Sequence, residues 1–457
     1  MVVGLSGLGN RQVAGWKAVR RAIGRLIVVT LAVIVGLDAR VEARAQQPAK
    51  GGRRNATAEG LQGKVLVGYQ GWFRCPGDGS PANAWSHWSR GKEPSAETMA
   101  VDVYPDTSEL KSTCPLTTES VHGKPGMLFS SYSRETVEKH FEWMRQYGID
   151  GALVQRFVND IPGDRREGDT VLKNVIASAE AQHRVFAVEY DVSGAHADRV
   201  LQQLQQDWTY LVDTVHVTDS SAYLRMNGKP VVSIWGFGFN DGSHITDPKL
   251  AFEIIEWFQK NAHVVLMGGV PANWGSLRGD SVSDPEWAKV YAAFDIVQPW
   301  TVGRYGSLRD AGNWKQSHLI PDVKLTASNG QLYMPVIFPG FSWHNLNRDK
   351  PENQIPRLKG EFLWTQAYNA RTAGATVVKI AMFDEVNEGT AIFKAASSRE
   401  DAPEPGYWLT LDADGTRLPN DWYLQIAGEI GKMFRGEIAP KSTLPIKPRP
   451  VVAAQSR

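Results

Sequence analysis

Two glutamates near the end of the chain have the residue type and spacing needed to act on one glycosidic bond. Glu385 and Glu388 are three residues apart in the segment DEVNEGT (384–390). Glycosidic cleavage needs one carboxyl group to protonate the leaving oxygen and a second to assist attack at the anomeric carbon. Glu385 and Glu388 are therefore the predicted catalytic pair, and Asp384 and Asn387 are predicted to bind substrate hydroxyl groups.

The position of this segment strengthens the prediction, because glutamates three residues apart are also common on solvated helices. The segment follows residues 376–383, the last of a series of short apolar runs. Continuous apolar runs are typical of parallel strands that are covered on both faces. The predicted strands are 65–69, 151–157, 185–190, 230–235, 263–268, 295–299, 332–338 and 376–383.

Segments with the spacing of amphipathic helices alternate with these runs. The alternation predicts a (β/α)₈ TIM barrel over residues 63–436, with a long insertion at 70–133 after the first strand. An open doubly wound sheet is the alternative, but the sequence lacks its glycine-rich phosphate-binding loop. The connection between 295–299 and 332–338 has the least clear helix. The other predicted helices are 136–147, 170–182, 197–212, 249–261, 286–294, 358–372 and 422–434.

Residues that follow the predicted strands are candidates for substrate binding, because barrel enzymes place their active sites at the carboxyl ends of the strands. Tryptophan recurs there, and its apolar ring face can stack on a sugar, so a saccharide cleft is predicted. A single tryptophan at a strand end more often belongs to the packing. The tryptophans in question are Trp72, Trp235, Trp274, Trp300 and Trp343. The other predicted substrate-binding residues are Tyr69, Gln155, Arg156, Tyr190 and His344. Gln70 and Asp191 also follow strands.

These residues carry a resemblance to a known group of enzymes. The segment 383–390 resembles the (N/D)-E-x-x-E-G-T signature of family 99 glycoside hydrolases, the endo-α-mannosidases, and their family 71 relatives. The segments VGYQGWF (67–73), AVEY (187–190) and NGKPVV (227–232) are also similar. Together they span roughly residues 65–395, and the chain looks most like the bacterial 71/99-like branch.

The resemblance implies a barrel that cleaves glycosides with retention of configuration. Glu385 would deprotonate the substrate 2-hydroxyl, which attacks the anomeric carbon to form a 1,2-anhydro sugar. Glu388 would be the general acid and then the base, so its pKa is expected to be raised beside an ionised Glu385. Glu189 is implied in the substrate site. Val386 and Asn387 replace the aromatic residue and the histidine of the family signature.

Two alternatives remain open at the level of the sequence. One is a glycosidase for xylosides or arabinosides in which a carboxylate attacks directly. The other is a catalytically silent carbohydrate-binding barrel. If the saccharide cleft exists, at least three of the five tryptophans are expected to share one concavity with Glu385, Glu388 and Glu189.

The ends of the chain and its cysteines predict export. An apolar run at 26–37 follows Arg25 and precedes a small-x-small site at 43–45, which is typical of a cleaved secretory signal over residues 1–45. The mature protein is then expected in the periplasm or outside the cell, without a stable membrane span. Residues 46–62 are predicted to be a linker and 437–457 a disordered tail. In an oxidising compartment, the pair Cys75 and Cys114 is predicted to form a disulfide.

Composition restricts the remaining functions. The chain is 42% hydrophobic and 22% charged, as in a folded protein. Beyond residue 45 there are 43 basic and 47 acidic residues, and this mildly acidic balance argues against nucleic acid as a partner. No H-E-x-x-H motif or phosphate-binding loop is present, so neither a metal nor another cofactor is expected, and carbohydrate is the predicted ligand.

Overall fold

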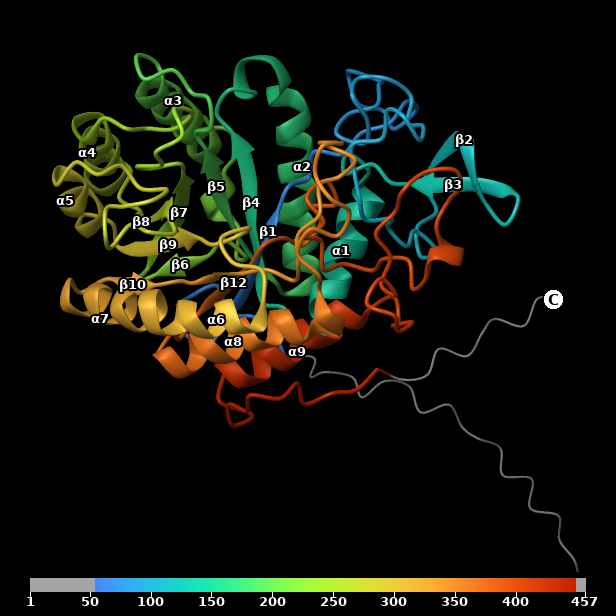
Figure 1. Cartoon of the computed structure of the whole chain (residues 1–457). Helices are drawn as coiled ribbons and strands as arrows, with labels where there is room; N and C mark the ends of the chain where they lie inside the picture. Colours follow the sequence, from blue (N-terminus) through green and yellow to red (C-terminus); the bar gives the residue numbers. More distant parts are fainter. Residues whose placement is uncertain (1–53, 449–457) are drawn as a thin grey trace, which may run out of the picture. The chain divides into compact units, whose positions relative to one another are not determined.

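The computed structural model describes residues 54–448, and the predicted signal at 1–45 lies outside them. Within this range, parallel strands form a barrel in the order expected for a (β/α)₈ fold, which confirms the predicted fold class (Figure 1). Each of the predicted apolar runs contributes to the barrel. The strands are β1 (Val65–Tyr69), β4 (Gly151–Phe157), β5 (Val185–Asp191), β7 (Lys229–Trp235), β8 (Val265–Pro271), β9 (Ile296–Trp300), β10 (Leu332–Tyr333), β11 (Val336–Ile337) and β12 (Val378–Ile380).

The seventh strand position is divided between β10 and β11, and this division closes the barrel. β10 pairs with β9, whereas β11 pairs with β12. The change of partner falls at Met334 and Pro335, where the Met334 amide donates to Val297 and the Pro335 carbonyl accepts from Lys379. Proline has no amide hydrogen, so it suits a point where one strand partner is exchanged for another.

Helices surround the barrel and follow its strands (Figure 1). The unclear connection after β9 contains two helices joined by a π-helical turn at Lys315–Leu319. A short strand, β6 (Arg225–Met226), pairs with β7 in the antiparallel direction. No helix of the described part is long and apolar enough to cross a membrane. The helices are α1 (Arg134–Tyr147), α2 (Ile161–Gln182), α3 (Val200–Asp213), α4 (Pro248–Glu256), α5 (Glu286–Ala292), α6 (Leu308–Trp314), α7 (Ile320–Ser328), α8 (Glu361–Ala373) and α9 (Trp422–Phe434).

The predicted insertion between β1 and α1 contains an antiparallel hairpin, β2 (Cys114–Val121) and β3 (Lys124–Leu128). Cys75 and Cys114 form a disulfide with their Cα atoms 6.2 Å apart, as predicted. Buried Asp102 fastens the insertion to the loop after β11, because its carboxylate accepts from the Ser342 hydroxyl and from two backbone amides. The insertion therefore forms one wall at the carboxyl ends of the strands.

Residues just outside the barrel are more ordered than the sequence suggested. In the predicted tail, the Trp364 indole donates to the Lys441 carbonyl at 3.0 Å, and Ile438 and Leu444 pack on the core. The prediction of disorder therefore does not hold for residues 437–448. The last part of the predicted linker is held in a similar way, since the Gly60 amide donates to Arg225.

Candidate active site

The interior of the barrel contains a polar layer built on Glu189. One carboxylate oxygen of Glu189 accepts from Lys379 at 2.6 Å and from Gln155 at 2.5 Å, and the other accepts from Ser233 at 2.9 Å. Lys379 also donates to Gln298 at 3.0 Å. Glu189 and Lys379 are completely buried, so this layer is a closed ion-pair network rather than an exposed substrate site.

A second inward-facing layer lies at the mouth of the barrel, two residues further along the strands. Strand pairing aligns Phe157, Asp191 and Trp235, and side chains two residues apart in a strand point to the same side. Gly269 leaves room for the Trp235 ring, because a Cβ atom there would lie 2.4 Å from it. The mouth thus combines aromatic surface with a partly exposed carboxylate.

Glu385 and Glu388 lie in the loop that follows β12, on the same rim. Asp384 fixes the start of this loop, since its two carboxylate oxygens accept from the amides of Gln70 and Gly71 at 2.8 and 2.9 Å. The Gln70 side chain in turn hydrogen-bonds to the Glu385 carboxyl group. The loops after the first and the eighth strand therefore hold each other in place.

Gly389 sets the course of the chain directly after Glu388. Its φ of 65° lies in the left-handed region, and an added Cβ atom would lie 2.8 Å from the Ser342 amide nitrogen. The Ser342 amide donates to the Glu388 carbonyl at 2.8 Å. Glycine is thus required here by close packing on the loop after β11, so the signature glycine has a structural explanation.

The two glutamates interact electrostatically. Burial raises the pKa of Glu388 to about 7. Burial also raises the pKa of Glu385 well above its usual range, and the charges of Glu388, Asp384 and Asp191 add to this effect. The expected raised pKa of Glu388 is present, but the expected ionised Glu385 is not. The pair therefore retains a proton near neutral pH, and Glu385 holds it more strongly.

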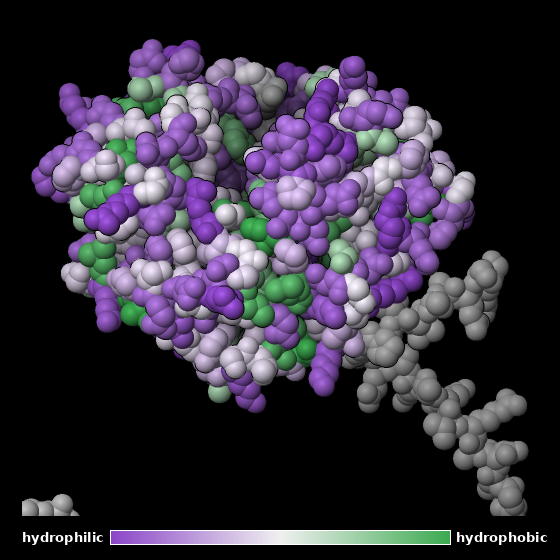
Figure 2. Space-filling view, in the orientation of Figure 1, coloured by the Kyte–Doolittle hydropathy of each residue, from purple (hydrophilic) through white to green (hydrophobic). Residues whose placement is uncertain are grey.

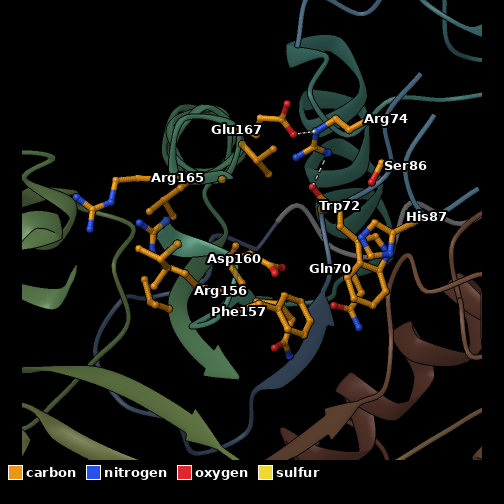
Figure 3. Close-up of a pocket in the computed structure, with 18 residues that line it drawn as sticks. Gln70, Trp72, Arg74, Ser86, His87, Arg156, Phe157, Asp160, Arg165 and Glu167 are labelled. Atoms are coloured by element: carbon orange, nitrogen blue, oxygen red, sulfur yellow. Dashed lines mark hydrogen bonds and ion pairs between the residues drawn. The ribbon is translucent and has the colours of Figure 1, made fainter. Parts of the chain in front are cut away.

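A cleft lies between the insertion and the end of β4. Gln70 connects it to Glu385, but neither Glu385 nor Glu388 is among its lining residues. Its lining includes Gln70, Trp72, His87, Gln155 and Phe157. Figure 3 shows Trp72 and His87 on one side of it and Arg156 and Arg165 on the other. Figure 2 shows the surface hollowed above β4.

The predicted tryptophans do not all belong to this cleft. Trp72 lines it and stacks on His87, with ring centroids 4.1 Å apart. Trp235 and Trp300 meet edge to face at 5.6 Å in the mouth layer, and Trp300 covers the Lys379 ammonium. Trp343 is half-buried in the loop after β11. Trp72 is the one of the five that lines this cleft, and Glu385, Glu388 and Glu189 do not line it, so the cleft is not the concavity that was expected to hold three tryptophans and the three glutamates.

Several residues predicted to bind substrate are part of the packing instead. They lie at or just after the ends of strands, but their side chains are packed in the core. Tyr69 is buried and bonds to His140, Trp274 is buried and donates to Asp322, and Tyr190 is buried and donates to Asp207.

Other predicted ligands use their polar atoms for internal contacts. Arg156 lies beside the cleft, but its guanidinium forms a bidentate pair with Asp207 and a further bond to Asp169. Asn387 donates to the His87 carbonyl at 2.9 Å, and therefore positions the insertion rather than a sugar. His344 bonds to the Lys350 carbonyl in its own loop.

Sequence reasoning did not assign roles to four residues that shape the site. They are Gln70, His87, Phe157 and Asp191. The strand ends made Gln70 and Asp191 visible, whereas no local signal marks His87, which enters the site from the insertion. Among residues 54–448, no group of three His, Cys, Asp or Glu side chains converges as metal ligands.

The comparisons with known proteins concern the fold. No family model and no curated protein sequence matches the chain. Among solved structures, a GH99 endo-α-mannosidase from Bacteroides thetaiotaomicron in complex with Bis-Tris-propane is similar, with 17% identity and a TM-score of 0.59. A second structure of a GH99 endo-α-mannosidase from this organism has 16% identity and a TM-score of 0.58. Each match covers 82% of this chain and 99% of the other.

These matches define the class of fold. The chain folds as the TIM barrel seen in GH99 endo-α-mannosidases, and the match extends over nearly the whole length of those enzymes. The resemblance that the sequence motifs indicated is thereby confirmed at the level of the fold.

Proposed function

We propose that this protein is a glycoside hydrolase that acts on a polysaccharide or glycan with Glu385 and Glu388 as its catalytic pair. The observation that carries the proposal is the placement of two electrostatically coupled glutamates on the carboxyl-end rim, where barrel enzymes perform catalysis. The cleft that Gln70 connects to Glu385 offers an aromatic wall at Trp72 and Phe157. A coupled carboxyl pair that retains one proton supplies the acid and the base that glycosidic cleavage needs.

The roles of the two glutamates follow from how a substrate would redistribute this proton. A substrate 2-hydroxyl that donates to Glu385 stabilises its ionised form, because a hydrogen bond to a charged group favours the charge. The proton then resides on Glu388, which protonates the leaving oxygen. Glu385 takes the proton of the 2-hydroxyl as that oxygen attacks the anomeric carbon, and a 1,2-anhydro sugar forms. Water then gives a proton to Glu388 as its oxygen attacks the anomeric carbon, and Glu385 returns its proton to the 2-oxygen, so the product forms with retention of configuration.

The finer parts of the proposal come from the sequence. The apolar run at 26–37 supports export to the periplasm or the cell exterior. The disulfide between Cys75 and Cys114 fits an oxidising compartment. Val386 and Asn387 replace two residues of the mannosidase signature, so the substrates to be tested include sugars other than mannose.

The activity can be tested with the purified protein and a panel of aryl glycosides, oligosaccharides and polysaccharides. We expect hydrolysis of at least one member, and a product whose first-formed anomer, observed by NMR, has the configuration of the substrate. Glu385→Gln and Glu388→Gln serve as matched controls. Binding of a glycan without turnover by the wild type would instead identify a silent carbohydrate-binding barrel.

The route through the 2-hydroxyl has its own test. An aryl glycoside that carries a methyl group on its 2-oxygen cannot form the 1,2-anhydro sugar. We expect it to bind and to resist cleavage, while the parent compound is hydrolysed. Cleavage of both compounds at similar rates would assign direct attack by a carboxylate.

A further inference from the structure

The two carboxylates on β5 face the same side of the strand but have different surroundings. Glu189 is fully buried, and both of its carboxylate oxygens are occupied by Lys379, Gln155 and Ser233. Asp191 lies two residues further on and is partly exposed at the mouth. Among the described residues, Ser193 alone hydrogen-bonds to the Asp191 carboxylate, through its amide at 2.8 Å and through its side chain. Asp191 therefore has acceptor capacity left for a ligand.

The surroundings of Asp191 are those of a ligand-facing residue. Its neighbours in the strand register are Phe157, which lines the cleft, and Trp235, which belongs to the mouth layer. The charge of Asp191 contributes to the raised pKa of Glu385, so the two carboxyl groups share one electrostatic environment. Among residues 54–448, no arginine or lysine forms an ion pair with Asp191.

A hydrogen-bonded chain extends from Asp191 away from the mouth. The Ser193 hydroxyl lies 3.0 Å from His244 Nε2, and His244 Nδ1 lies 2.7 Å from Asp241 Oδ1. The His244 side chain is only 8% exposed, and its ring packs against Trp235 at a centroid distance of 4.9 Å. The chain thus connects the mouth carboxylate to the surface, where Asp241 is 47% exposed.

This connectivity of serine, histidine and aspartate is also that of a hydrolase triad, but the surroundings do not suit that chemistry. An oxyanion needs free amide donors beside the serine. The Ser193 amide is bonded to Asp191, and the Gly194 amide is bonded to the Ser243 carbonyl at 2.6 Å. A carboxylate next to the serine would also repel an oxyanion. The chain is therefore better suited to orient Asp191 than to attack a carbonyl.

We propose that Asp191, in place of Glu189, is the carboxylate of β5 that contacts the sugar at the mouth, and that Ser193, His244 and Asp241 are its positioning residues. The inference rests on the proposed glycosidase function and adds a substrate contact to it. A carboxylate held from behind by Ser193 can accept hydrogen bonds from sugar hydroxyl groups. Glu189 then belongs to the interior that supports the mouth.

The first experiment compares isosteric variants of the two carboxylates, using a glycan that the wild type hydrolyses. Asp191→Asn is expected to lower kcat/KM by about tenfold or more, as in removal of a charged hydrogen-bond partner. The thermal unfolding midpoint should stay close to that of the wild type. Glu189→Gln should lower the thermal unfolding midpoint, and it should change KM less than Asp191→Asn does. Asp191→Ser provides a second variant should Asp191→Asn fold poorly.

The second experiment tests the positioning chain with a double-mutant cycle. Asp241→Asn should reduce kcat/KM several-fold, and the double variant Asp191→Asn/Asp241→Asn should lose little more than Asp191→Asn alone, because both act through one contact. Asp219→Asn is the matched control, since Asp219 also pairs with a histidine three residues away, at an exposed site. It should leave the kinetics unchanged.

The outcomes distinguish a failure of the Asp191 assignment from a failure of the proposed glycosidase function. Wild-type kinetics in Asp191→Asn, or additive losses in the double variant, would overturn the inference and leave the glycosidase function intact. A larger rise in KM for Glu189→Gln than for Asp191→Asn, without a change in the unfolding midpoint, would also overturn it. A wild type that hydrolyses no glycan would overturn the proposed function, and this inference with it.

Discussion

The barrel contains acidic side chains in two environments, and the difference separates residues that support the fold from residues proposed to act on a substrate. In the interior, Glu189 is neutralised by Lys379 and saturated with hydrogen bonds. At the mouth, Glu385, Glu388 and Asp191 have no ion-pair partner within the described chain, and each has a raised pKa. Burial of a carboxyl group without a cation is compensated by retention of a proton. The same residue type is therefore inert in one layer and able to transfer protons in the next.

The largest expected effect concerns Glu385. Glu385→Gln should lower kcat by on the order of 10²-fold or more with every substrate, because no group then activates the attacking oxygen. The free energy of unfolding should be unchanged or higher, since the variant no longer buries an ionisable group. Steady-state kinetics and denaturant unfolding measure the two quantities. Wild-type turnover of a natural substrate by this variant would contradict the assignment.

Glu388→Gln should have a more selective effect. With poor leaving groups, we expect kcat to fall about as much as in Glu385→Gln. With activated aryl glycosides, which need little protonation, the rate of the first step should be largely preserved. Rates for a series of aryl leaving groups provide the measurement. Equal losses across the series would remove Glu388 from the role of general acid.

Substitutions in the interior layer should lower the free energy of unfolding rather than kcat. Lys379→Met leaves Glu189 buried without its cation, which typically costs about 3–5 kcal/mol of unfolding free energy. The double variant Lys379→Met/Glu189→Leu should recover most of this loss, because it removes the stranded charge. Chemical denaturation of both variants is the measurement. A stable Lys379→Met protein with reduced kcat would show that the layer takes part in catalysis.

The smallest expected effect is the pH dependence of kcat/KM, which reflects the joint titration of Glu385 and Glu388. Below about pH 7 Glu388 is protonated along with Glu385, so no base is available, and kcat/KM should fall as the pH decreases. Above that pH one carboxyl group of the pair is ionised and activity should rise. At still higher pH the second proton is lost and the rate should fall again, as expected for a coupled pair. A profile that is flat from pH 5 to 8 would contradict the shared proton.

Much of the fold was predictable from the sequence because the signals are local. Continuous apolar runs mark parallel strands covered on both sides, and each predicted run is found in the barrel. The proposed catalytic pair could also be named from the sequence, because Glu385 and Glu388 belong to one short segment at a strand end. The disulfide between Cys75 and Cys114 was predictable because the chain has two cysteines and both lie in loops. Their separation along the chain does not by itself set the distance between them.

The direction of each side chain was decided only by the tertiary structure. Tyr69 and Tyr190 stand at the ends of their strands and Trp274 follows β8, yet strand alternation and packing place their side chains in the core. Asp384 and Asn387 belong to the signature, but backbone groups of distant segments occupy their polar atoms. The sequence by itself determined the barrel and the acidic pair, through apolar periodicity and residue type. Which acids carry a cation and which retain a proton depended on contacts such as Lys379 to Glu189, which join residues 190 positions apart.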